Sequence, residues 1–215
     1  METSGQITEW QNIRVSELGH TFADWQLEYQ CKSIFGGVSV PGSNPGFAVV
    51  IAMGKEERFA GHDMCLLDEF ESFDLRELIQ KCRAFDLKYA PKMWIGDDKN
   101  SAADRFITEM NTSSKGRFGL TSTAMLDMED LYSYIIPQIK DLIREDRRRL
   151  YLKDSKVVNY LGGIQAGEIA ELEPGDYPAI EALAFAAIEM RDRDGKGLMT
   201  KEQWRALKAK YGYGW

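Results

Sequence analysis

Two short apolar runs joined by a tight turn constrain the fold of this chain more than any other feature. The run SIFGGVSV (33–40) is followed by the turn cluster PGSNPG and then by FAVVIAM, residues 47–53. A short continuous apolar run bounded by turn residues is typical of a buried β-strand. A third run, MCLLDEFE at 64–71, follows a polar interval. The sequence therefore predicts three successive strands.

Helical and strand patterns alternate after this point. Ser72 and Asp74 are cap residues for a helix that ends before Pro91. The further elements predicted are strands at 92–96, 118–124, 150–152 and 167–173, helices at 101–110, 128–146 and 179–190, and a small helix that ends at Gly162–Gly163. This order predicts an α/β fold, in which helices flank a mixed β-sheet.

The length and composition are those of one main globular domain. The chain has 215 residues, of which 44% are hydrophobic and 28% are charged, enough to bury a sizeable core. We expect residues 1–32 to form an N-terminal helical arm or linker and residues 33–190 to form the domain. Residues 191–215 are expected to form a turn and a helix with an aromatic tail.

Charge, cysteines and hydropathy exclude several classes of protein. The net charge is −7, so contact with nucleic acid requires a local basic patch, and Arg147, Arg148 and Arg149 are the candidates. A solvated helix end explains the same three arginines. The three cysteines predict neither a disulfide framework nor a zinc site, which favours a reducing, cytoplasmic location. No apolar run approaches the roughly 18 residues of a membrane span, and no phosphate-binding P-loop occurs.

Two acidic segments are the candidate functional residues. Asp97 and Asp98 directly follow the buried strand at 92–96, and Glu181 lies one turn inside the helix at 179–190. Adjacent acids are also common helix caps, and a single helical glutamate is usually solvated. Mg²⁺ or Mn²⁺, however, requires carboxylates from different elements, and two such cations clamp a phosphodiester during hydrolysis.

The same segments resemble a known family. The segment DDKNSA (97–102) is similar to the acidic–Asp–Lys–Ala–Ser–Gly signature of phage terminase large subunits, with Asp97 at the metal-binding acid and Lys99 matching the lysine. The segment YPAIEAL (177–183) resembles the late Asp-Asp-x-x-Asp-Ala-Leu helix of that family, with Glu181 at its last acid. The resemblance spans roughly residues 33–190.

The resemblance implies a ribonuclease-H-like fold and a metal-dependent endonuclease that cuts double-stranded DNA during viral genome packaging. Asp97 and Glu181 are the implied catalytic residues, and the implied metal ligands are Asp97, Asp98, Asp176 and Glu181. Lys99 and the arginine run would contact DNA. The implied partners are a packaging ATPase, a small terminase subunit or a portal, in the host-cell cytoplasm.

The chain departs from the family at two places. The turn after the first strand resembles an Asp-Pro-Gly turn, but Val40 occupies the position expected for the aspartate that bridges both metals, with Ser39 beside it. Tyr177 and Pro178 replace the paired acids, and Asp176 precedes them by one place. Because valine cannot ligate a cation, we expect weakened or regulated cleavage.

Two other functions fit the sequence. One is a catalytically inactive module that retains the fold and docks a motor ATPase or portal. The other is a calcium-responsive protein, because Asp192, Asp194 and Gly197 match the first, third and sixth positions of an EF-hand loop. Gln203 stands where that loop needs its final glutamate, so a turn before the last helix explains the segment better.

Overall fold

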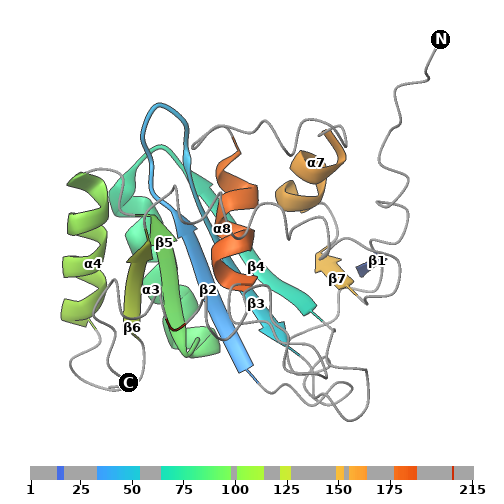
Figure 1. The fold of residues 1–215 in the computed structure, drawn as a ribbon, viewed down its shortest axis with the longest axis horizontal. Helices are drawn as coiled ribbons and strands as arrows, with labels where there is room; N and C mark the ends of the chain where they lie inside the picture. The colour runs from blue at the N-terminus through green and yellow to red at the C-terminus, as the bar shows by residue number, and fades with distance from the viewer. Residues whose placement is uncertain are drawn as a thin grey trace.

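Seven strands form one mixed sheet in the computed structural model (Figure 1). The structure describes residues 14–16, 33–53, 64–97, 101–113, 122–126, 149–152, 155–163, 177–187 and 205. The strands are β1 (Arg14–Ser16), β2 (Ser33–Ser39), β3 (Gly46–Met53), β4 (Met64–Ser72), β5 (Met93–Asp97), β6 (Ser122–Leu126) and β7 (Arg149–Leu152). The helices are α3 (Leu75–Tyr89), α4 (Ser101–Ser113), α7 (Lys156–Gly163) and α8 (Pro178–Ala187).

The strand order is β1-β7-β4-β3-β2-β5-β6. β2, β3 and β4 pair antiparallel in succession, whereas β5 and β6 run parallel to β2. The predicted α/β architecture with a mixed sheet is therefore confirmed. Because β2, β4, β5 and β6 run in one direction, their carboxyl ends lie at the same edge of the sheet.

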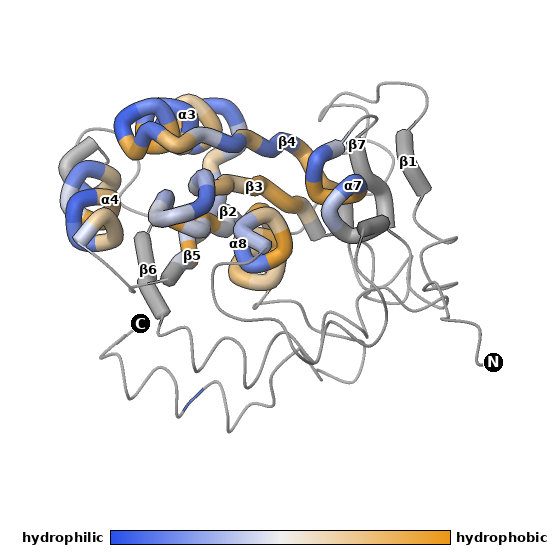
Figure 2. The backbone as a smooth tube through the Cα atoms, turned by 90° about the horizontal axis from the view of Figure 1, so that it is seen from above, coloured by the Kyte–Doolittle hydropathy of each residue, from blue (hydrophilic) through white to orange (hydrophobic). Residues whose placement is uncertain are grey.

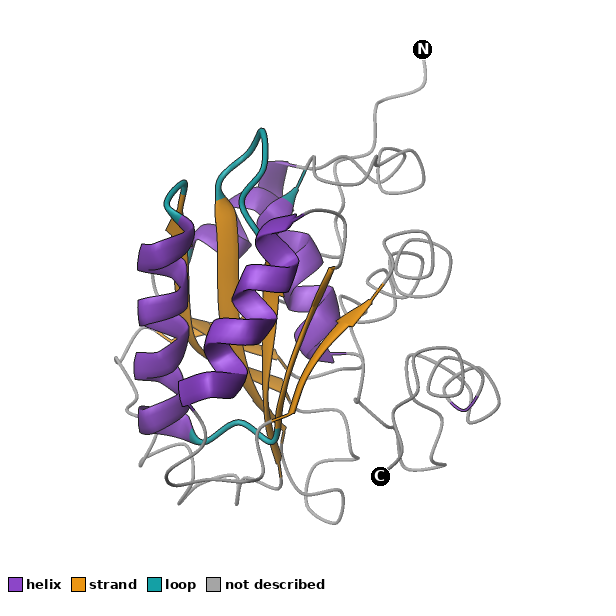
Figure 3. Ribbon diagram, turned by 90° about the vertical axis from the view of Figure 1, so that its left-hand side faces the viewer, coloured by secondary structure: helices purple, strands orange, loops and turns teal. Residues whose placement is uncertain are grey.

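Helices cover both faces of the sheet (Figure 3). Figure 2 shows α3 and α8 on opposite sides of β2 and β3. The α3 face holds an apolar cluster, to which α4 contributes Ala103, Phe106 and Met110. On the other face, α8 contacts β2, β3 and β5, and α7 lies beside α8.

The boundaries of α3 follow from its capping residues. The Asp74 carboxylate accepts a hydrogen bond from the backbone N–H of Arg76 at 2.8 Å, as the sequence predicted for this cap. The helix ends at Ala90, which has a left-handed backbone with φ 47° and donates its N–H to the carbonyl of Asp86. Pro91 then prevents the helix from continuing.

Close packing of α8 depends on Gly37 in the middle of β2. A Cβ atom at Gly37 would lie 1.9 Å from the carbonyl oxygen of Ala182 and 2.6 Å from the backbone nitrogen of Ala186. The helix is alanine-rich, and every one of its residues is buried. The helix predicted at 179–190 is therefore present from Pro178 to Ala187 and packs closely on the strand.

A bulge in β4 changes which residues face α3. Val50 pairs with Asp68, but Ile51 pairs with Leu66, so Leu67 is the extra residue. Leu67 belongs to the apolar cluster on the α3 face, and Asp68 accepts a hydrogen bond from the Tyr89 hydroxyl of α3 at 3.0 Å. Leu67 and Asp68, although consecutive, therefore both contact the α3 side of the sheet.

Some predictions lie outside the described residues. These are the N-terminal arm apart from residues 14–16, the helix at 128–146, the strand at 167–173 and the EF-hand-like segment at 192–204. The predicted strand at 118–124 is described from Ser122 and runs to Leu126. In the N-terminal segment, β1 pairs in parallel with β7 at the edge of the sheet. Within the described part of the chain, no helix is both long and apolar enough to cross a bilayer.

Candidate functional site

A buried hydroxyl–carboxylate pair marks the carboxyl-end edge of the sheet. The Ser39 Oγ, at the last residue of β2, donates a hydrogen bond to Oε2 of Glu181 in the first turn of α8, at 2.8 Å. Both residues have 0% of their surface exposed. A buried carboxylate is costly unless hydrogen bonds or a cation compensate its charge. The pair is therefore the natural centre of a candidate site.

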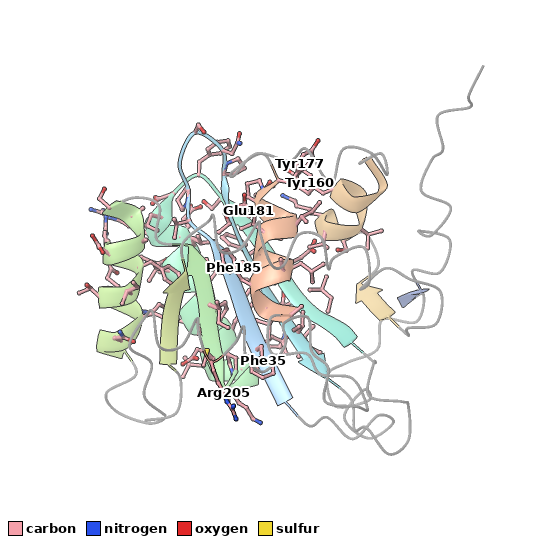
Figure 4. All side chains as sticks on the ribbon, in the orientation of Figure 1. Phe35, Tyr160, Tyr177, Glu181, Phe185 and Arg205 are labelled. Atoms are coloured by element: carbon pink, nitrogen blue, oxygen red, sulfur yellow. The ribbon has the colours of Figure 1, made fainter. Side chains whose placement is uncertain are left out.

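The start of α8 positions Glu181. The carbonyl of Tyr177 accepts hydrogen bonds from the backbone N–H groups of Ile180 and Glu181, at 2.9 and 3.0 Å. Pro178 occupies the first helical position, where its missing N–H costs nothing and its fixed φ suits the helix. Figure 4 shows Glu181 toward the same end of the molecule as Tyr160 and Tyr177. The carboxylate also lies at the end of the helix that favours negative charge.

The structure corrects the sequence interpretation of Val40. Val40 is 2% exposed and belongs to the apolar cluster on the α3 face, together with Val38 and Leu78. Gly37 and Ser39, in contrast, meet α8 on the opposite face. Because side chains alternate along a strand, a shift of one residue exchanges the two faces. Ser39 therefore faces Glu181, whereas Val40, the position at which the bridging acid was expected, faces the α3 side of the sheet.

The backbone of Asp97 reaches the same edge of the sheet. Gly37 pairs with Ile95, and Val38 pairs with Gly96. Ser39 and Asp97 are the next residues of these two parallel strands, so their backbones lie side by side. Asp97 is the last residue of β5, and α8 contacts β5 as well as β2. The last residue of β5 therefore lies beside the end of β2, where Ser39 contacts Glu181 of α8.

The remaining predicted site residues are not placed. Asp98, Lys99, Arg147, Arg148 and Asp176 lie outside the described residues. Arg149 is described as the first residue of β7, where its backbone pairs with Met64. Asp98 and Asp176 therefore stay predicted metal ligands, and Lys99 and the arginine run stay predicted DNA contacts.

A second polar cluster, which sequence reasoning missed, lies on the same face as Ser39. Ser39 pairs with Phe47 across β3, and Phe47 pairs with Glu71 on β4, so the three residues form one row. Glu71 accepts hydrogen bonds from the Tyr160 hydroxyl at 2.9 Å and from the Lys156 ammonium. Burial, followed by the charge and hydrogen bond of Glu71, raises the pKa of Tyr160. Glutamates at alternate positions of the apolar run 64–71 were the available signal.

Comparison with solved structures identifies the fold. No protein-family model and no curated protein matches the sequence. The nuclease domain of the g2p large terminase from bacteriophage SPP1, with bound Mn, matches with a TM-score of 0.53 and 17% sequence identity, over 82% of this chain and 96% of that one. The nuclease domain of the large terminase subunit gp2 of bacterial virus Sf6, with manganese and beta-thujaplicinol, matches with a TM-score of 0.51 and 12% identity, over 83% and 95%.

The chain has the terminase-nuclease fold. This fold confirms the ribonuclease-H-like architecture expected from DDKNSA and YPAIEAL, even though few residues are identical. The antiparallel strands β2, β3 and β4, followed by the parallel strands β5 and β6, are its central sheet.

The described side chains at this edge provide oxygen atoms. A hard divalent cation takes oxygen ligands, and a carboxylate that bridges two cations also neutralises part of their combined charge. The Ser39 hydroxyl is uncharged, so β2 provides no such carboxylate. In the part of the chain that the structure describes, no cluster of three His, Cys, Asp or Glu side chains is arranged to hold a metal. Among the described side chains at this edge, the Glu181 carboxylate and the Ser39 hydroxyl are oxygen groups of the kind that such a cation takes.

Proposed function

We propose that the chain is a divalent-metal-dependent DNA endonuclease domain of reduced activity, which acts on double-stranded DNA in viral genome packaging. The observation that carries the proposal is the end of β2 within a terminase-nuclease fold, where Ser39 contacts Glu181 of α8 and β5 pairs alongside in parallel. Asp97 and Glu181 come from these two elements. The host-cell cytoplasm is the corresponding location.

Each residue has a role in this proposal. Asp97 and Glu181 would hold Mg²⁺ or Mn²⁺, assisted by Asp98 or Asp176. When bound, the cation would polarise the phosphodiester and assist the attack of water. Lys99 would offset phosphate charge, and the arginines at 147–149 would contact the DNA backbone. Ser39 orients Glu181 by its hydrogen bond, and the close packing of α8 keeps solvent away from that pair.

Nicking of supercoiled plasmid in the presence of Mn²⁺ tests the proposal. We expect slow metal-dependent nicking by the natural protein and a loss of roughly a hundredfold or more in Asp97→Ala, because a ligand of the cation is removed. Asp104→Ala is the matched control, since Asp104 is an exposed acid in the first turn of α4. It should nick like the natural protein. If the natural protein and Asp97→Ala both fail to cut, or cut equally, the proposal is wrong.

A non-catalytic assembly module is the second candidate, and the neutral Ser39 at the acid position favours it. Such a module would keep the fold and dock a packaging ATPase, a small terminase subunit or a portal. Analytical ultracentrifugation with a purified portal or packaging ATPase tests this function. A complex formed equally by the natural protein and by Asp97→Ala, with no nicking by either, would support the assembly module over the endonuclease.

A further inference from the structure

The geometry points to Tyr160 of α7 as a positioning residue for the Glu181 carboxylate of α8. The inference rests on the proposed function and adds to it the contact that holds α8 in place from the β4 side. Beneath α8 lie β2, β3 and β5, with Gly37 at the closest approach. Beside it lies α7 (Figure 1), so the placement of α7 bears directly on that of α8.

The Tyr160 side chain reaches the row of residues that begins at Ser39. Ser39 pairs with Phe47, and Phe47 pairs with Glu71, so the three side chains lie on one face of the sheet. The Tyr160 hydroxyl donates a hydrogen bond to Oε1 of Glu71 at 2.9 Å. Its ring stands edge-on to that of the fully buried Phe47, with the ring centroids 6.4 Å apart. Tyr160 therefore occupies the β3–β4 half of the row whose β2 end holds the Ser39–Glu181 pair.

Two attachments, one helical turn apart, fix α7 on the sheet. At the start of the helix, the Glu69 carboxylate accepts hydrogen bonds from the Ser155 hydroxyl and from backbone N–H groups. One turn later, Glu71 accepts the Tyr160 hydroxyl as well as the Lys156 ammonium. A helix of eight residues is too short to be stable alone, and a single attachment would let it pivot. The Tyr160 contact therefore sets the angle at which α7 meets α8.

The hydroxyl is the part of Tyr160 that fixes this angle. A phenylalanine would keep the edge-on contact with Phe47 but lose the hydrogen bond to Glu71. The Glu71 side chain is only 18% exposed, so water replaces the lost donor incompletely. The helix would then turn about its first attachment, and the first turn of α8 would move with it. Because a functional group must be held to within about half an ångström, such a movement at Glu181 changes what the carboxylate binds.

The test compares the natural protein with Tyr160→Phe, Glu71→Ala and the variant that carries both changes. Tyr89→Phe is the matched control. The Tyr89 hydroxyl also donates to a carboxylate, that of Asp68 at 3.0 Å, but on the α3 side of the sheet. Its loss should lower the Tm as the loss of the Tyr160 hydroxyl does, which separates general destabilisation from positioning.

The first readout requires neither metal nor activity. It is the carbon NMR signal of the Glu181 side-chain carboxylate, measured in EDTA and identified by its absence in Glu181→Gln. We expect this signal to shift in Tyr160→Phe and in Glu71→Ala. The double variant should shift it no further, because both changes remove the same contact. Tyr89→Phe should leave the signal where it is.

The second readout is metal binding and cleavage. We expect calorimetry to show roughly tenfold weaker Mn²⁺ binding by Tyr160→Phe than by the natural protein. The kcat for nicking of supercoiled plasmid should fall by a similar factor. The KM for the plasmid should stay constant, because a positioning residue acts on the carboxylate and not on DNA.

Several results would overturn the inference. One is an unchanged Glu181 signal in Tyr160→Phe, and another is an equal change in Tyr89→Phe. Additive effects of Tyr160→Phe and Glu71→Ala would also contradict it, as would a raised KM with an unchanged kcat. Should Glu71→Ala fail to fold, Tyr160→Phe alone decides, since it removes a single oxygen atom. Failure of the proposed function is distinct: the Glu181 signal would shift as expected, yet the natural protein would neither bind Mn²⁺ nor nick plasmid.

Discussion

Gly37 has no side chain at the point where α8 comes closest to the sheet. A methyl group there would meet backbone atoms of Ala182 and Ala186, which cannot rotate away as a flexible side chain can. The helix would have to move as a unit, and the Ser39–Glu181 hydrogen bond would lengthen with it.

We therefore predict that Gly37→Ala lowers the free energy of unfolding by about 3 kcal/mol, the upper part of the range for overpacked cores. Urea denaturation followed by circular dichroism measures the change. Ser43→Ala, at an exposed position of the β2–β3 turn, is the control and should change stability by less than about 0.5 kcal/mol. Equal stability of the two variants would show that α8 is not held against β2 at this height.

Cys82 on α3 gives a prediction on pH. Its thiol is fully buried, and burial first, then the charge of Asp86, raises the pKa of the thiol well above its ordinary value of 9.0. In the unfolded chain the thiol ionises near pH 9, whereas in the folded protein it stays protonated. The stability linked to this group is therefore complete below pH 9 and is lost as the pH rises beyond it.

Between about pH 8 and pH 10, the natural protein should lose about 1 kcal/mol more stability than Cys82→Ala. Urea denaturation of both proteins at the two pH values measures the difference, and groups common to both cancel. A loss of the same size in both proteins would mean that the native Cys82 thiol ionises freely.

The residues around Ser39 show what sequence reasoning achieves at this scale. The missing acid was assigned to Val40 because the Pro41–Gly42 turn matched an Asp-Pro-Gly pattern, whereas the residue that contacts Glu181 is Ser39. A turn motif does not fix which face a strand residue reaches. The position of the residue along the strand decides this, because side chains alternate between the two faces. Gly37 and Ser39 both face α8, and only the packing of the helix on the sheet shows which face that is.

At the scale of elements, α7 is held by an acid from a different element. The Glu69 carboxylate on β4 accepts hydrogen bonds from the Ser155 hydroxyl at 2.7 Å, from the Val157 N–H at 3.3 Å and from the Lys156 N–H. It therefore satisfies N–H groups at the start of α7 and places a negative charge at the favourable end of the helix. This contact docks α7 beside α8, next to the candidate site.

Glu69→Gln keeps the shape of the side chain and removes its charge. We predict a loss of about 1 to 2 kcal/mol in the free energy of unfolding, because a charged cap at a helix N-terminus is replaced by a neutral one. Glu109→Gln on α4, which breaks ion pairs with Arg105 and Arg83 at partly exposed side chains, should cost less than about 1 kcal/mol. If Glu69→Gln costs no more than this control, the carboxylate does not hold α7.

Element prediction succeeded where the local signal was strong. The three strands from 33 to 71, the capped helix before Pro91 and the alanine-rich helix near 179 were all predicted from apolar period and capping residues. The bulge at Leu67 and the docking of α7 on Glu69 were not, because both depend on partners distant in the sequence. Local patterns carry little information on such contacts.

At the scale of the whole molecule, the strand order decides which elements border the candidate site. The elements that carry Asp97 and Glu181 are far apart in sequence, yet both lie against β2: β5 pairs with it in parallel, and α8 packs on its face. The family resemblance predicts that Asp97 and Glu181 hold the same cation.

A crystal of the protein soaked in MnCl₂, with anomalous diffraction measured at the manganese edge, tests this arrangement most directly. We predict an anomalous peak in contact with carboxylate oxygens of both Asp97 and Glu181, which disappears after EDTA treatment. Carboxylates of residues 97 and 181 on opposite sides of the sheet, or a peak elsewhere with none here, would contradict the metal site itself.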